Sequence, residues 1–314
     1  TDPQLTAPGI SAGEINGWTD AGNVTGNTLT MDGVSYLTGS VYGGVTFGTG
    51  RAEGNHLVLK NGTVVNVYAA GGRTFGGNAI NNKVTISGAA TSASLIYAAG
   101  GVTDGASGDV ASNKAVMQSG TASNLYGGFV LGPNSKGSAT GNEVTLSGGT
   151  VGHDVAGGII QGPSATSQGT GNVTGNKVNI TGGTVNGVTY GGLARGIGAA
   201  TTNKVTVSGV ATALKDVKGG QTSTGKASSN EVDFKEASAD NLIGGRVSGT
   251  NAAGDAAGNK VTLRSGTIAY DVRGGDIVAP TAAGSVADNS VTINNGSVGR
   301  AVTGGYNMGR GSTE

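Results

Sequence analysis

The densest group of side chains with catalytic potential is acidic and lies between positions 216 and 240. It comprises Asp216, Glu231, Asp233 and Asp240, with Lys235 near Asp233. Two carboxylates on neighbouring strands supply the acid and the base or nucleophile with which many enzymes cleave a polysaccharide. A solvated face with local ion pairs would gather the same residue types. A polysaccharide-cleaving enzyme of the tailspike or lyase type is therefore the alternative to a structural function.

Other catalytic or metal-binding arrangements are missing from the sequence. The chain has no cysteine and two histidines, His56 and His153, which stand in unrelated contexts. These facts exclude a thiolate zinc site, a disulfide framework, a cysteine nucleophile and a Ser-His-Asp triad. The phosphate-binding GxxxxGK[ST] pattern does not occur either. We expect no cofactor and no metal ion.

Tyr42, Tyr126 and Tyr190 each directly precede a Gly-Gly pair. Exposed tyrosines in a row stack on sugar rings or pack against a partner protein, so these three are candidate surface-binding residues. Packing of the side chains within the wall of the fold is the alternative interpretation.

Aspartate and asparagine alternate three residues before several Gly-Gly pairs. Asp154, Asp216 and Asp271 hold this position in three places, and Asn124 and Asn241 hold it in two others. Both side chains accept hydrogen bonds from turn backbone, which favours a structural acceptor over catalysis at this position.

All of these residues belong to an internal repeat whose units start with an asparagine. Successive asparagines are 27 to 34 residues apart, and the first glycine of a Gly-Gly pair follows each of them by 14 to 18 residues. A repeat of this length is typical of a solenoid, in which each unit buries its apolar side only against its neighbours. The asparagines are Asn27, Asn55, Asn82, Asn113, Asn142, Asn176, Asn203, Asn230, Asn259 and Asn289.

Apolar residues occupy the second and fourth positions after each of these asparagines, as Val144 and Leu146 do after Asn142. The position between them is mostly threonine or another polar residue, here Thr145. An apolar period of two predicts a β-strand with one face inward, and no segment sustains the 3.6-residue period of a helix.

The sequence thus predicts an all-β fold, a right-handed parallel β-helix (β-solenoid) of about ten coils with 27–34 residues per coil. Residues 27–314 would form the ten-repeat β-helix, and residues 1–26 the end of a preceding coil or an N-terminal cap. At the ~4.8 Å spacing of strands, the coils make a rod on the order of 50 Å long. Both ends of such a rod expose strand edges, which favours end-to-end self-association.

Glycine makes up 63 of the 314 residues, whereas charged residues make up 12% and aromatic residues 4%. We expect the Gly-Gly pairs to provide positive φ or close backbone approach at one corner of the coil. At another corner the asparagines should form a structural ladder of stacked amides, helped by their tolerance of the left-handed conformation. The 19 basic and 19 acidic residues cancel, so the composition predicts no nucleic acid partner.

The segment NEVTLSGGTV from Asn142 to Val151, followed by DVAGG from Asp154 to Gly158, exemplifies a repeat style that extends over essentially the whole chain. It resembles the autotransporter (type V secretion) passenger domains of Gram-negative bacteria, in particular the Gly-rich repeat adhesins. The resemblance implies a right-handed β-helix at the cell surface, anchored in the outer membrane through a segment outside this sequence. It also implies a role in adhesion, aggregation or biofilm formation.

We therefore expect a structural and adhesive rod, secreted or displayed on the cell surface, that mediates cell adhesion, self-association or filament and biofilm formation. Its expected partners are a protein or glycan of a host or bacterial surface and further copies of itself. Apolar runs fall far short of the ~20 residues of a membrane helix, so no direct insertion of this segment into a membrane is expected. Enzymatic activity is retained only as the glycan hydrolase or lyase alternative.

Overall fold

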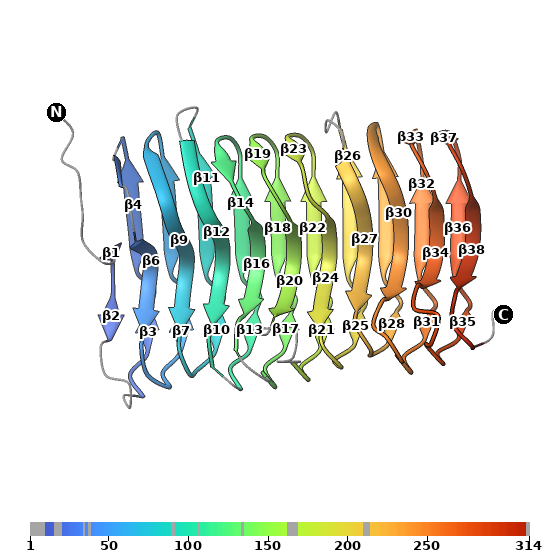
Figure 1. Cartoon of the computed structure of the whole chain (residues 1–314). Coiled ribbons are helices and arrows are strands. Elements are labelled where there is room, and N and C mark those ends of the chain that lie inside the picture. Colours follow the sequence, from blue (N-terminus) through green and yellow to red (C-terminus); the bar gives the residue numbers. More distant parts are fainter. Residues whose placement is uncertain are drawn as a thin grey trace.

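The computed structural model describes residues 10–15, 21–33, 35–36, 39–88, 92–105, 107–132, 135–161, 169–209 and 214–311. These residues form only strands and connecting turns, and the strands stack in parallel in three long sheets and one short sheet. Figure 1 shows the coils side by side in chain order, so that the molecule is a straight rod. The predicted β-solenoid is confirmed.

Each coil contributes a two-residue strand to sheet B, a longer strand to sheet C and its longest extended segment to sheet A. Sheet B consists of β3 (Val24–Thr25), β7 (Ala52–Glu53), β10 (Ala79–Ile80), β13 (Val110–Ala111), β17 (Ala139–Thr140), β21 (Val173–Thr174), β25 (Ala200–Thr201), β28 (Ala227–Ser228), β31 (Ala256–Ala257) and β35 (Val286–Ala287). Sheet C consists of β4 (Thr28–Asp32), β8 (His56–Lys60), β11 (Lys83–Ser87), β14 (Lys114–Met117), β18 (Glu143–Leu146), β22 (Lys177–Ile180), β26 (Lys204–Ser208), β29 (Glu231–Lys235), β32 (Lys260–Leu263) and β36 (Ser290–Ile293).

Sheet A holds the strands that carry the Gly-Gly pairs, together with shorter strands beside them. Its members are β1 (Ile10–Ser11), β2 (Glu14–Ile15), β5 (Ser35–Tyr36), β6 (Gly39–Thr46), β9 (Thr63–Thr74), β12 (Ser92–Thr103), β16 (Leu125–Val130), β20 (Val155–Gln161), β24 (Thr189–Arg195), β27 (Leu214–Thr222), β30 (Ala237–Val247), β33 (Gly266–Ile268), β34 (Val272–Ile277), β37 (Ser297–Val298) and β38 (Val302–Asn307). The short sheet D pairs β15 (Thr121–Ala122), β19 (Thr150–Val151) and β23 (Thr184–Val185).

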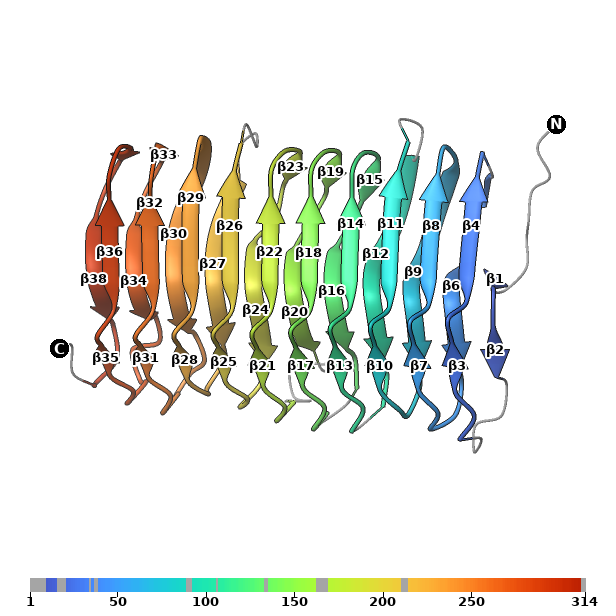
Figure 2. The same cartoon turned by 180° about the vertical axis from the view of Figure 1, so that it is seen from behind.

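The coil is right-handed. In Figure 1 the strands of sheet A run downward on the near side while the chain advances to the right, and Figure 2 shows the strands of sheet C running upward on the opposite side. Parallel strands joined by a crossover take this hand because each strand twists to the right. At the N-terminal end, β1 and β2 pair with β6, and β3 pairs with β7, so these three strands extend sheets A and B ahead of the first full coil.

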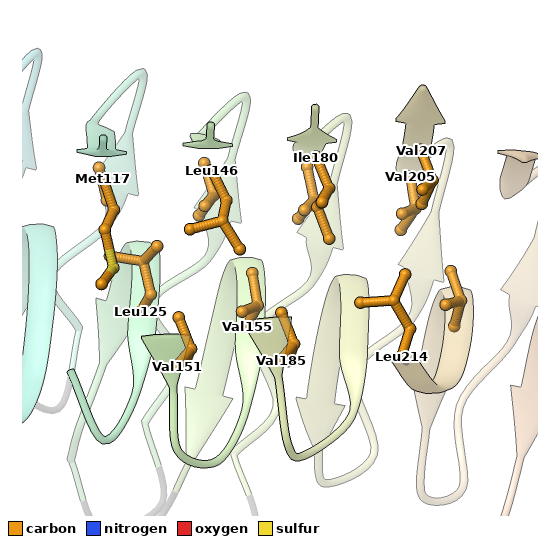
Figure 3. Packing of buried hydrophobic residues seen from close by; sticks show 14 of the residues in the cluster. Met117, Leu125, Leu146, Val151, Val155, Ile180, Val185, Val205, Val207 and Leu214 are labelled. Atoms are coloured by element: carbon orange, nitrogen blue, oxygen red, sulfur yellow. The ribbon is translucent and has the colours of Figure 1, made fainter. Parts of the chain in front are cut away.

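The main apolar core lies between sheet C and the first half of each sheet A strand. Figure 3 shows Met117, Leu146 and Ile180 of sheet C pointing toward Leu125 and other residues of the opposite wall. Both apolar columns predicted from the sequence lie in this core up to the last coil, where Ile293 is 39% exposed, and the two residues of the central coil, Val144 and Leu146, are fully buried. Burial of each such side chain stabilises the fold by roughly 1.5–3 kcal/mol. Further apolar clusters fill the space between sheet B and the second half of the sheet A strands.

A ladder of asparagine side chains separates these apolar regions and runs along the corner between sheets B and C. The Nδ2 of each ladder asparagine donates to the Oδ1 of the asparagine in the next coil over 2.8–3.1 Å, with 2.9 Å between Asn142 and Asn176. The same Nδ2 of Asn142 donates to the Val110 carbonyl, and its Oδ1 also accepts from the backbone N–H of Asn113. The predicted ladder is present from Asn27 to Asn289, and its amides from Asn55 to Asn259 are fully buried.

The left-handed backbone lies one residue before each ladder asparagine. In all ten coils φ at this position is between 53° and 69°, whether the residue is glycine, as at Gly175, or not, as at Thr202. The expectation that the asparagines themselves adopt this conformation is therefore wrong. The chain completes its turn before the asparagine, and the asparagine side chain is thereby directed into the stack.

The Gly-Gly pairs lie in the strands of sheet A and face the ladder. A Cβ on Gly158 would lie 2.5 Å from Oδ1 of Asn176, and a Cβ on the first glycine, Gly157, would lie 2.5 Å from the Gly191 carbonyl of the next coil. The register skips this first glycine, so the strand bends at the pair. The predicted close approach of the backbone at the Gly-Gly pairs is confirmed. None of these pairs has a positive φ, because they lie at a bend within a strand and need no left-handed turn.

We expect Asn142→Ala to lower the free energy of unfolding by at least about 3 kcal/mol, because it leaves buried groups of Asn113, Val110 and Asn176 without hydrogen-bond partners. Asn179→Ala is the matched control, since this asparagine lies on the outward position of β22 and bonds Glu143 at 3.2 Å. Its loss should stay below about 1 kcal/mol. Equal losses in denaturant titrations of the two variants would contradict the ladder's role.

Two glycine substitutions should separate close approach from backbone conformation. Gly158→Ala forces a methyl group onto the buried Asn176 amide and should cost about 3 kcal/mol or more. Gly175→Ala places its methyl group in open space, because no atom lies within 4 Å of a Cβ added at this residue, whose φ is +65°. The left-handed backbone conformation alone should then cost only about 1 kcal/mol. Thermal unfolding of both variants measures the difference, and a larger loss for Gly175→Ala would refute this account of the glycine pairs.

Candidate functional site

The candidate tyrosines lie on the outer face of sheet A beside the glycine bend. Tyr42, Tyr126 and Tyr190 are each 6% exposed. They belong to a cluster made only of sheet A residues and their flanks, whereas the adjacent residue Leu125 points into the main core. The rings therefore pack within the wall, and the interpretation of these tyrosines as exposed binding residues is corrected.

We call this row of outward side chains the outer seam. It consists of Tyr42, Val45, Ala70, Tyr97, Ala99, Val102, Tyr126, Phe129, Ala156, Ile159, Tyr190 and Leu193. The bend at Gly-Gly brings together the side chains on either side of the pair, so the Tyr126 and Phe129 rings meet edge to face with centroids 5.1 Å apart. Burial raises the pKa of Tyr190 to about 12 and raises that of Tyr126 as well.

In the later coils most of the same positions carry charged or polar side chains. Lys218 and Arg273 stand directly before the glycine pair, and Gln221, Arg246 and Asp276 stand directly after it. Asp276 is fully buried and accepts from Nη2 of Arg246 at 2.6 Å and from Nη1 of Arg273 at 3.3 Å. Rings and aliphatic groups thus hold the seam positions of the earlier coils, with Arg73 as the charged exception, and an ion-pair network holds most of them in the later coils.

Lys218 lies between the aromatic part of the seam and the ion-pair network and contacts both. Its ammonium lies 5.3 Å from the Tyr190 ring centroid, 3.3 Å from Asp216 and 3.1 Å from Gln221. Burial, together with the charge of Arg246, lowers its pKa to about 8. Burial acts to raise the pKa of Asp216, but hydrogen bonds from Asn241 and Lys218 outweigh it, and the pKa lies below its ordinary value.

A cavity of about 310 Å³ opens over this network on sheet A. Its lining comprises Asp216, Asn241, Ile243, Arg246, Tyr270, Asp271, Arg273 and Arg300. The Arg300 side chain is 65% exposed and approaches Asp271 only to 3.7 Å, whereas Arg273 bonds the same aspartate at 2.7 Å. The Tyr270 ring is also exposed and lies 5.8 Å below the Arg300 guanidinium.

A second cavity, of about 330 Å³, lies at the N-terminal end of the same face. Tyr42, Phe47, Arg73 and Phe75 contribute to its lining. The Arg73 guanidinium stacks over the Phe75 ring at 4.6 Å and pairs with Asp104 at 2.6 Å, so its charge is already neutralised.

The acidic group found in the sequence does not form one site. Glu231 and Asp233 lie on β29 of sheet C, while Asp216 and Asp240 lie on β27 and β30 of sheet A. The chain crosses from sheet A to sheet C between them, which separates residues that are close in sequence. Each carboxylate has its own cation: Lys204 at 3.2 Å, Arg264 at 2.6 Å, Lys218 at 3.3 Å and Lys215 at 3.6 Å, respectively.

The Asp/Asn position before the glycine pairs provides hydrogen-bond acceptors between coils. Asn124 accepts from the backbone N–H of Asp154, Asn241 from that of Asp271, and Asp271 from that of Ala301, over 3.0–3.2 Å. The predicted structural role is confirmed at these positions. Asp216 differs, because it accepts from the Asn241 side chain at 2.7 Å.

Sequence reasoning missed the network of Lys218, Arg246, Arg273 and Asp276. The signal was present as charged residues replacing tyrosine, alanine or large apolar residues directly around a Gly-Gly pair. Of the histidines, His56 lies 2.9 Å from the Thr85 hydroxyl, and burial lowers its pKa. Within the described ranges no three His, Asp or Glu side chains gather as metal ligands. Nor does that part of the chain contain a helix able to cross a membrane.

The stack of parallel coils, the buried amide ladder and the polar cavity define the molecule as a right-handed β-solenoid with a surface cavity on one sheet. No family model, no curated protein and no solved structure matches the chain.

We expect Lys218→Met to remove a pH-dependent component of stability. The folded-state pKa of Lys218 is about 8 and its ordinary value is 10.5, so between these pH values the unfolded chain binds more protons. The free energy of unfolding of the wild type should therefore rise with pH relative to the variant across this window, by up to about 3 kcal/mol. Denaturant titrations at pH 7.5 and 10 test this, and parallel pH profiles would contradict it.

Proposed function

We propose that this β-solenoid is a structural and adhesive rod, secreted or displayed on the cell surface, that mediates adhesion, self-association or filament and biofilm formation. One observation carries the proposal: the features common to all coils are buried, whereas the exposed positions differ from coil to coil. The ladder and the glycine bend build a uniform scaffold. Recognition is then left to side chains that the scaffold presents along its surface.

The resemblance to autotransporter passengers supports the location and the partners that we propose. Passenger domains of this style are β-helical rods at the outer surface of Gram-negative bacteria, and the right-handed coil described above fits that architecture. We accordingly propose a host or bacterial surface protein or glycan as partner.

Stacking along the rod axis is the arrangement that we propose for self-association. Ile293 and Val302 occupy inward columns and are 39% and 48% exposed, whereas their counterparts one coil earlier, Leu263 and Val272, are fully buried. A further coil stacked on this end, from another copy or from additional chain, would bury them and extend all three long sheets.

A polysaccharide-cleaving enzyme is the second candidate. It is favoured by the two carboxylates, Asp216 and Asp271, that line the polar cavity. The lowered pKa of Asp216 suits a base or nucleophile and leaves the general acid unassigned.

The adhesive function is tested with beads that carry the purified chain. We expect these beads to aggregate with one another or to attach to bacterial or host cells at least tenfold more than beads carrying the heat-unfolded chain. Reducing-sugar release from a polysaccharide panel is measured in parallel. Unchanged attachment and aggregation, together with sugar release that Asp216→Asn abolishes, would replace the adhesive function with the enzymatic one.

A further inference from the structure

We propose that the cavity beside Tyr270 and Arg300 binds a carboxylated sugar unit of an acidic polysaccharide. The proposal rests on the adhesive function and names the ligand class of one recognition site on the rod. The cavity volume of about 310 Å³ lies at the lower end of the range for small-molecule sites.

The charges around the cavity favour a ligand with a single negative charge. Its lining holds three arginines and two aspartates, which leaves one net positive charge. Arg246 and Arg273 are held by Asp276, which lies fully buried beneath them. Of the three arginines, Arg300 alone has a mostly exposed side chain, and its ion pair with Asp271 is long, at 3.7 Å, whereas no hydrogen bond from its side chain occurs among the described residues. Its guanidinium is therefore available for a bidentate bond to a carboxylate.

The same lining also suits hydroxyl groups. Asp216 and Asp271 retain lone pairs beyond the bonds they accept, because each carboxylate offers about four acceptor sites. Sulfate or chloride has no donor for these acceptors and is repelled by them. A sugar acid presents hydroxyl donors and a carboxylate on one ring, so its hydroxyls match the two aspartates and its carboxylate matches Arg300.

Tyr270 adds an apolar platform at the right place. Its ring is 46% exposed and lies under the Arg300 guanidinium at 5.8 Å. The C–H face of a sugar ring stacks on such an aromatic surface while its polar edge reaches neighbouring side chains. Ile243 is the one aliphatic residue in the lining, so the cavity lacks the apolar centre that a peptide partner would require.

The experiment measures binding of an oligogalacturonate to the full chain by calorimetry. Methyl-esterified oligogalacturonate keeps the hydroxyls without the charge, sulfated dextran supplies anions without carboxylates, and polyglutamate supplies carboxylates on a peptide. We expect the free oligogalacturonate to bind at least tenfold more tightly than each of these three. Equal or tighter binding of any of them would overturn the proposal.

Two variants test the site itself. Arg300→Gln and Tyr270→Ala change exposed side chains, so the melting temperature should stay near that of the wild type, and each should weaken oligogalacturonate binding about tenfold or more. Arg195→Gln is the matched control, because Arg195 lies on the same sheet with its side chain 49% exposed and should change binding less than twofold. Unaltered affinity in Arg300→Gln, or no binding by the wild type, refutes the sugar site. Bead attachment that persists in that case leaves the adhesive function standing.

Discussion

The buried amide ladder is the constraint on which the rest of the structure depends. Each ladder amide bonds groups in the coils before and after it, so a coil without the asparagine leaves its neighbours with unpaired buried donors and acceptors. The ladder also fixes register, since a slip of one residue would turn the inward columns of sheet C outward. One side chain per coil thereby aligns strands in all three long sheets.

The ladder dictates the shape of the opposite wall. Because Asn176 fills the narrow space between the apolar regions, the facing strand must come close, and only glycine leaves room at Gly157 and Gly158. Both glycines face inward, which bends the strand and brings the flanking residues Ala156 and Ile159 to the outer face, where they are fully buried. The outer seam is therefore a by-product of interior packing. It is also where side chains of successive coils meet in a continuous row on the outside of sheet A.

The sequence sufficed to predict what repeats. The Asn spacing, the period-two columns and the glycine pairs each have one physical explanation in a stack of parallel coils, and together they specified the fold and the ladder. The left-handed residue was misplaced by one position, because serine, threonine and aspartate hold it as well as glycine and asparagine. The site was harder to predict, because side chains whose sequence position suggests exposure, such as Tyr126, are buried by a bend in the strand that becomes apparent only in the three-dimensional structure. The acidic residues could not be recognised from the sequence as separate for a related reason. Glu231 and Asp216 are near in sequence, yet they belong to different sheets.

The charged residues that hold the seam positions in the later coils are not required by the fold. Phe129, Ile159 and Leu193 occupy the position that Arg246 and Asp276 occupy further along, and those coils stack in the same register. Replacing buried ion pairs with packed apolar groups is often neutral or stabilising. The earlier coils therefore fill this position with apolar side chains, and the later coils replace them with charged ones. Because Lys218 also carries a depressed pKa there, the departure has an energetic cost, which stability alone does not explain. A network that holds guanidinium groups beneath an open cavity is consistent with the sugar binding proposed above.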